Sequence, residues 1–163
     1  MSNVRPHMHT PIHTGPDGLA DFAKECALSL FAAVEHEFKF PAGCSLQYWP
    51  IPEIKAANEP FLKSLRGRAN VYAFFVRRTG SEDWLPVYVG ERKSAALRDR
   101  LTQHLISKSH QTGSMLEAVK TAVAGGDSIG LSLIKVQPES LRLFVEESII
   151  AAHKDTLPWN THG

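Results

Sequence analysis

The sequence predicts an α+β fold: a small three-stranded sheet, mixed or antiparallel, flanked by helices and preceded by an N-terminal helical extension. Two β-rich runs, "NVYAFFVRR" and "PVYVG", are separated by "TGSEDWL", whose composition is typical of turns. A third β-rich run, "SIGLSLIKVQ", follows two segments with helical spacing of apolar residues and precedes another. The predicted element order is therefore β-β-α-α-β-α.

Composition places the chain among ordinary globular proteins. It has 163 residues, of which 43% are hydrophobic and 21% charged, and this balance excludes wholesale disorder and suggests one main domain. No apolar run approaches the ~20 residues that cross a bilayer, and the N-terminus lacks an apolar signal core. Cys26 and Cys44 do not make a disulfide framework and are expected to be reduced. A cytoplasmic protein without membrane association is expected.

The sequence predicts two units in the chain, with the boundary at about residue 69. Residues 1–15 hold two prolines and no apolar period, which predicts a flexible tail. Residues 16–69 form the helical extension, with a helix expected from about Asp17 to Phe38. After it, "SLQYWPIPEI" is expected to be extended and "ANEPFLKSLRG" to form a short helix. Residues 70–163 form the second unit.

Local signals place the elements of the second unit. Pro86 can only open its strand or lie on a sheet edge, because proline donates no ladder hydrogen bond. Ser94 is expected to cap the helix "SAALRDRLTQHLISKS", and Gly125–Gly126 to end the helix "GSMLEAVKTAVA". Pro138 is expected in the first turn of the last helix, "PESLRLFVEESIIAAHKD".

Charge is unevenly distributed along a chain whose net charge is only +1. The stretch from Lys63 to Lys108 contains ten Lys or Arg residues and four acidic residues, a net charge of +6. A basic centre of this kind is compatible with a polyanionic partner. On charge alone, however, a solvated helix and hairpin explain it better.

Two groups of polar residues stand beside apolar stripes on predicted helices. Arg100 and His104 are one turn apart and share a helix face, next to the stripe of Leu97, Leu101 and Leu105. Glu146 and Glu147 interrupt an apolar face and point about 100° apart, so only one of them faces the sheet. For Glu146, a salt bridge and a metal site are both compatible with the pattern.

In order along the chain, these features resemble the GIY-YIG nuclease domain over roughly residues 70–160. The matching positions are Asn70-Val71-Tyr72, Tyr88-Val89-Gly90, Arg100 and His104 in "LRDRLTQH", Glu146 ahead of "SII", and Asn160 after a proline. Residues 1–69 have no counterpart in the minimal module. Two tripeptides alone would be weak evidence, but five elements in the same order on the same kinds of structure are more specific.

The resemblance implies a divalent-metal-dependent endonuclease that hydrolyses phosphodiester bonds in DNA, most simply double-stranded DNA. It implies one Mg²⁺ or Mn²⁺ ion per site, bound by Glu146, and it leaves a homodimer open. The implied catalytic residues are Tyr72, Tyr88, Arg100, His104 and Glu146. The implied substrate-binding residues are Gly90, Arg92, Lys93 and Asn160.

The proposed chemistry assigns each group a task. Arg100 would stabilise charge on phosphoryl oxygens, and one tyrosine would deprotonate water and relay the proton to His104, whose ordinary pKa near ~6.5 suits a proton acceptor. Which tyrosine acts as the base is left open. Asn70 stands where the family has a glycine. This replacement is expected to be tolerated, because asparagine also adopts unusual backbone angles. Glu91 stands where lysine is common, so an inactive nucleic-acid-binding or interaction module with this fold is the alternative.

Overall fold

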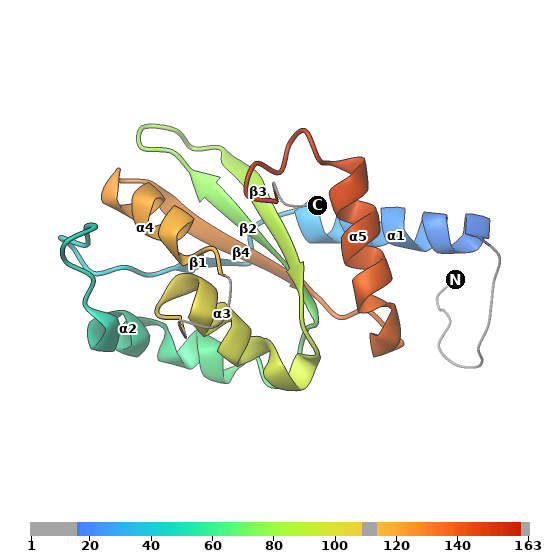
Figure 1. The fold of residues 1–163 in the computed structure, drawn as a ribbon, viewed down its shortest axis with the longest axis horizontal. Coiled ribbons are helices and arrows are strands. Elements are labelled where there is room, and N and C mark those ends of the chain that lie inside the picture. The colour runs from blue at the N-terminus through green and yellow to red at the C-terminus, as the bar shows by residue number, and fades with distance from the viewer. Residues whose placement is uncertain (1–15, 109–113, 161–163) are drawn as a thin grey trace.

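The structure, a computed structural model, describes residues 16–108 and 114–160 and confirms the α+β class (Figure 1). The expected flexible tail, residues 1–15, lies outside the described residues. The described strands form one antiparallel sheet in the order β1-β4-β2-β3, with bounds β1 His36–Phe38, β2 Val71–Arg77, β3 Trp84–Glu91 and β4 Ser128–Ile134. The α-helices are α1 Pro16–Phe31, α2 Ile51–Lys63, α3 Leu97–Leu105, α4 Leu116–Ala124 and α5 Arg142–Ala152.

The prediction of three strands was wrong, because the N-terminal segment supplies a fourth. The helix expected to reach Phe38 ends at Phe31, and β1 then pairs with β4 in the register His36 to Leu131. The side chains of β1 alternate in burial, and Phe38 belongs to the core. The sequence pattern of residues 33–38 is compatible with either a helix or a strand. The strand forms because it can pair with the edge of β4 that would otherwise be unpaired.

The hairpin of β2 and β3 confirms the predicted pair of β-rich runs. Tyr72 lies opposite Gly90, and Phe74 lies opposite Tyr88. The register then shifts, so that Phe75 lies opposite Pro86. Because β3 is the outer strand of the sheet, Pro86 removes no interior ladder bond, as the sequence predicted.

Helices cover both faces of the sheet, and each face has its own core (Figure 1). On one face, side chains of α2, α3 and α4 pack on alternate residues of β2 that include Tyr72 and Phe74. On the other face, α1 and α5 pack on Val71, Ala73 and Phe75. The period-2 alternation of a strand thus sends the two tyrosines of the hairpin to the α3 face.

Helix boundaries followed the predictions in part. Gly125 and Gly126 end α4, with Gly126 at a φ of 95°. A 3₁₀ turn over Ser94–Ala96 precedes α3, and no side chain caps it, so the predicted Ser94 cap was wrong. Pro138 precedes a second 3₁₀ turn, Glu139–Leu141, rather than the first turn of α5 itself. None of the helices in the described ranges combines the length and apolar character that a membrane span requires.

Candidate active site

Tyr72 and Tyr88 lie on neighbouring strands and face the same side of the sheet. Their ring centroids are 6.3 Å apart, and both rings contact the imidazole of His104, at 5.8 Å and 5.3 Å between centroids. Tyr72 is fully buried, whereas Tyr88 is only partly buried. Tyr88 is therefore the phenol of the pair that borders solvent.

Gly90 allows the two strands and the Tyr72 ring to fit together. A Cβ atom built on Gly90 would lie 2.5 Å from both Cζ and Oη of Tyr72. The ring thus lies directly over the glycine opposite it, so a side chain there would displace the phenol. This close approach gives the glycine of the sequence motif a steric reason, and the expected contact of Gly90 with substrate stays a prediction.

His104 is buried in α3, and its hydrogen bonds define its tautomer. The backbone N–H of Met115 donates to Nδ1 at 3.0 Å, so Nδ1 carries no proton. The neutral ring then carries its proton on Nε2, which donates to Oη of Tyr72 at 2.8 Å. Burial, together with the charges of Arg100 and Arg92, lowers the pKa of His104 to about 3. The relay to His104 expected from the sequence is wrong for this geometry, because both ring nitrogens are already engaged.

We expect His104 to stay neutral, with its proton on Nε2, from pH 8 down to pH 5. The unfolded chain takes up a proton near the ordinary pKa of 6.5, but the folded chain does not until about 3. Stability is therefore lost as pH falls below ~6.5, by at most about 1.4 kcal/mol per pH unit from this group. Imidazole ¹⁵N shifts in an NMR titration, assigned with His104→Gln, measure this directly. A ring that titrates near 6.5 would contradict the hydrogen-bond assignment.

The two phenols lie side by side beyond this hydrogen bond. Because Tyr72 accepts from His104, its own O–H is available as a donor toward the Tyr88 side of the site. Burial raises the pKa of both phenols, that of Tyr72 well above its ordinary value. Tyr88, which is less buried, is consequently the easier of the two to ionise.

Arginine side chains supply positive charge beside these phenols. Arg100 lowers the pKa of both tyrosines through its charge and through hydrogen bonds, and its Nη1 also donates to Gln103 at 3.0 Å. Arg92 is close enough to help lower the pKa of His104. Lys93, the next residue, is exposed, so Arg92 is the basic residue of this pair that lies nearer the site.

Glu146 completes the cluster from α5. Burial, together with the charges of Glu91 and Glu147, raises the pKa of its carboxyl to about 7. Arg142 lies one turn before Glu146 on the helix, and its Nε donates to Oε1 of Glu91 at 2.8 Å. The charge of Glu146 raises the pKa of both phenols, which places its carboxyl beside them.

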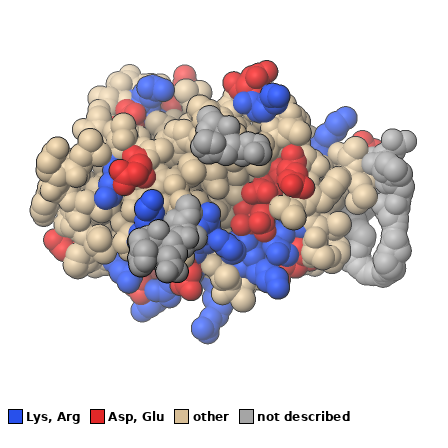
Figure 2. All heavy atoms as spheres, in the orientation of Figure 1, with Lys and Arg blue, Asp and Glu red and all other residues tan. Residues whose placement is uncertain are grey.

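Acidic and basic groups lie next to each other on this face of the molecule. Figure 2 shows Asp and Glu atoms gathered beside Lys and Arg atoms where α3, the end of β3 and α5 meet. The described residues contain no cluster of three or more His, Cys, Asp or Glu that could hold a metal ion. A site with one carboxylate still fits Mg²⁺, which keeps several of its waters. The carboxylate of Glu146, which lies beside both phenols, is the group that fits such an ion.

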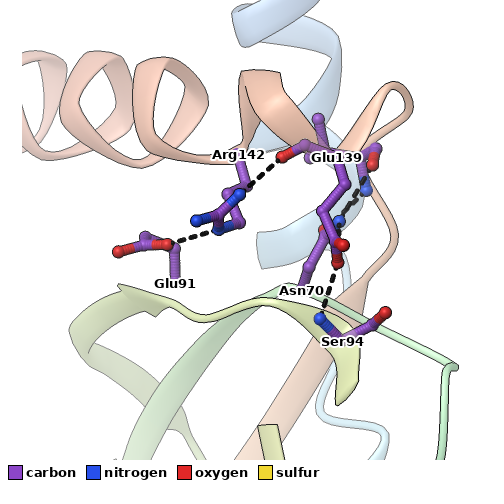
Figure 3. A network of polar contacts seen from close by, with 6 residues as sticks. Asn70, Glu91, Ser94, Glu139 and Arg142 are labelled. Atoms are coloured by element: carbon purple, nitrogen blue, oxygen red, sulfur yellow. Dashed lines mark hydrogen bonds and ion pairs between the residues drawn. The ribbon is translucent and has the colours of Figure 1, made fainter. Parts of the chain in front are cut away.

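Asn70 fixes the end of the sheet next to the site through hydrogen bonds that the sequence did not reveal (Figure 3). Its buried amide pairs with the backbone of Val136, donating from Nδ2 at 2.9 Å and accepting at Oδ1 at 2.7 Å. Nδ2 also reaches Oε2 of Glu139 at 3.4 Å, and the same oxygen accepts the N–H of Ser94 at 2.6 Å. Asn70 therefore links the start of β2, the 3₁₀ turn before α3 and the segment before α5.

Asn160 lies at the free edge of β3. Its side-chain amide accepts from the N–H of Val89 at 2.8 Å and donates to the C=O of the same residue at 3.0 Å. The backbone N–H of Trp159 donates to Val87 at 2.9 Å. Residues 159–160 thus cover an edge strand that would otherwise expose unpaired backbone groups. The expected contact of Asn160 with substrate stays a prediction. The second N–H of its side-chain amide could make such a contact.

The candidate active site thus combines residues from β2, β3, α3 and α5. The structure brings together all five residues that the resemblance implied as catalytic, namely Tyr72, Tyr88, Arg100, His104 and Glu146. Met115 and Arg142, which support this cluster, carry no sequence signal that identifies them, whereas Asn70 was found as a motif position but without its hydrogen bonds. No protein-family model, curated protein or solved structure matches this chain.

Proposed function

We propose that the protein is a divalent-metal-dependent endonuclease that hydrolyses phosphodiester bonds in DNA. The observation that carries the proposal is the convergence of Tyr72, Tyr88, Arg100 and Glu146 in one partly exposed site. The pKa values of the two phenols respond to both the arginine and the carboxylate. A guanidinium, a phenol and a carboxylate suit the charges that develop at a phosphate under attack.

The chain's own residues divide the work as follows. Tyr88, the less buried of the two phenols, positions the attacking water and takes its proton once ionised. Burial and the charge of Glu146 raise the pKa of Tyr88, whereas Arg100 lowers it, so neutralisation of Glu146 favours the phenolate. Arg100 offers a planar set of donors for phosphoryl oxygens. Tyr72 and His104 act as positioning residues, because both are fully buried.

The metal requirement is assigned to Glu146. A Mg²⁺ or Mn²⁺ ion bound there would polarise the phosphate and stabilise the leaving 3′-oxygen. The carboxyl must be ionised to bind the cation, and its pKa is raised to about 7. Metal-dependent activity should therefore rise with pH through this value.

Replacement of Arg100 by alanine tests the proposal. We expect Mg²⁺-dependent nicking of plasmid DNA to fall by roughly 10²- to 10³-fold, the usual loss when one donor to a developing oxyanion is removed. The measurement is initial nicking rate on supercoiled plasmid, with EDTA as the metal-free reference.

Arg98→Ala is the matched control for this prediction. Arg98 lies on the same helix, but it is exposed and pairs with Glu59 at 2.9 Å. We expect nicking by this variant to stay close to wild type. Equal background for wild type and both variants would rule out the nuclease. Salt-dependent DNA binding without cutting would instead support the inactive nucleic-acid-binding module.

A further inference from the structure

The end of the sheet at which β2 begins carries positive charge beyond Arg92 and Lys93, the two basic residues already expected to bind substrate. Three segments meet there: residues 63–70 before β2, residues 91–93 at the end of β3, and residues 134–137 at the end of β4. Asn70 connects them, because its N–H donates to Ile134 and its C=O accepts from the N–H of Arg92, both at 3.0 Å. These segments hold one acidic residue, Glu91, and six basic ones: Lys63, Arg66, Arg68, Arg92, Lys93 and Lys135.

Part of this charge is already engaged within the protein. Arg68 pairs with Glu35, Lys135 donates from Nζ to the C=O of Gly67 at 2.8 Å, and Glu91 is held by Arg142. Four basic residues remain for which the described ranges provide no carboxylate within ion-pair distance: Lys63, Arg66, Arg92 and Lys93. Three of these, all except Arg92, are exposed. We call these four residues the basic end.

The basic end begins at the active site. Val71 lies opposite both Glu91 and Ile134 in the last row of the sheet, and Tyr72 is the next residue along β2. Arg92 affects the pKa of His104, which places it beside the site. Figure 1 shows the C-terminal end of α2, where Lys63 lies, running toward the start of α3. A cationic surface therefore extends from the phosphodiester site toward the N-terminal segment.

We propose that the basic end binds backbone phosphates of duplex DNA on one side of the cleaved bond. The last turn of α2 and the residues after it thereby belong to the DNA-binding surface, and the N-terminal segment has a function beyond packing. The inference rests on the proposed function, because the site determines where the scissile phosphate lies. Cations without protein partners can bind phosphates and release counterions without first breaking an ion pair.

The test compares two double variants with the same change in charge. Arg66→Gln/Lys93→Gln alters the basic end. Arg78→Gln/Lys154→Gln alters exposed residues elsewhere: Arg78 follows β2 at its opposite end, and Lys154 follows the far end of α5. Binding of a fluorescent duplex of about 20 base pairs is measured by anisotropy in EDTA, from about 50 to 200 mM NaCl. Circular dichroism confirms that each variant is folded.

We expect the basic-end variant to reduce the magnitude of the slope of log K against log salt by about 1.8, since each phosphate contact contributes about 0.9. The control variant should keep the wild-type slope. Equal slopes for the two variants would overturn the proposal, even if the wild type nicks plasmid DNA, and the proposed function would then stand alone. A reduced slope in a protein that never cuts would support the basic end and refute the nuclease.

Discussion

Glu146→Gln should abolish Mg²⁺-dependent nicking and, at the same time, make the protein more stable. Removal of the assigned metal ligand should lower the nicking rate by about 10³-fold or more, since metal assistance contributes several kcal/mol to such reactions. The stability gain follows from the raised pKa. Between the ordinary value of 4.5 and about 7, the folded state holds a proton that the unfolded state releases. The wild type therefore loses stability as pH rises through this window, and glutamine does not.

The size of this gain in the free energy of unfolding follows from the difference between the pKa of Glu146 in the folded and the unfolded chain. At pH 8 we expect Glu146→Gln to unfold with a free energy higher by roughly 1–3 kcal/mol, allowing for partial solvent screening, and at pH 4 the difference should disappear. Urea denaturation in EDTA at both pH values measures this. Added Mg²⁺ should stabilise the wild type alone.

Glu147→Gln is the matched control for this prediction. Glu147 is the next residue of α5 and is exposed, so its replacement should change nicking and stability little. A loss of activity in Glu147→Gln equal to that in Glu146→Gln would show that general charge on α5, rather than one ligand, matters. An unchanged stability of Glu146→Gln at pH 8 would show that its carboxylate is already neutralised.

Gly90→Ala should destabilise the protein and remove activity through Tyr72, although alanine carries only one additional methyl group. Its Cβ would meet the Tyr72 ring at 2.5 Å. Because the ring is fully buried and hydrogen-bonded to His104, it cannot move without breaking that bond. We expect a stability loss of about 2 kcal/mol, typical of overpacking. Displacement of catalytic groups by about 1 Å should lower nicking roughly 10²-fold.

Gly125→Ala separates this steric effect from the general cost of replacing a glycine. Gly125 follows α4 with helical backbone angles, and a Cβ there would meet only two carbonyl oxygens at 3.5 Å, an ordinary contact. We expect its stability and nicking rate to match wild type. Thermal unfolding and plasmid nicking are compared for both variants. Wild-type behaviour of Gly90→Ala would mean that the Tyr72 ring is not held over Gly90.

The sequence predicted those features of the fold that depend on local signals. The β-rich runs around "TGSEDWL", the edge position of Pro86 and the end of α4 at Gly125 follow from turn chemistry and from what proline and glycine allow. The pairing of β1 with β4 could not be read in this way. Residues 36–38 are short and ambiguous in pattern, and only the unpaired edge of a distant strand specifies their conformation.

For the candidate site, the sequence alone determined which residue types are present and in what order. That order suggested Tyr72, Tyr88, Arg100, His104 and Glu146 before any geometry was known. Only the tertiary structure decided what each group can do. The N–H of Met115 sets the tautomer of His104, and burial lowers its pKa to about 3, so it cannot accept the proton assigned to it from sequence. Protonation states depend on neighbours that folding brings from distant parts of the chain and on the water that it excludes, and neither is encoded locally.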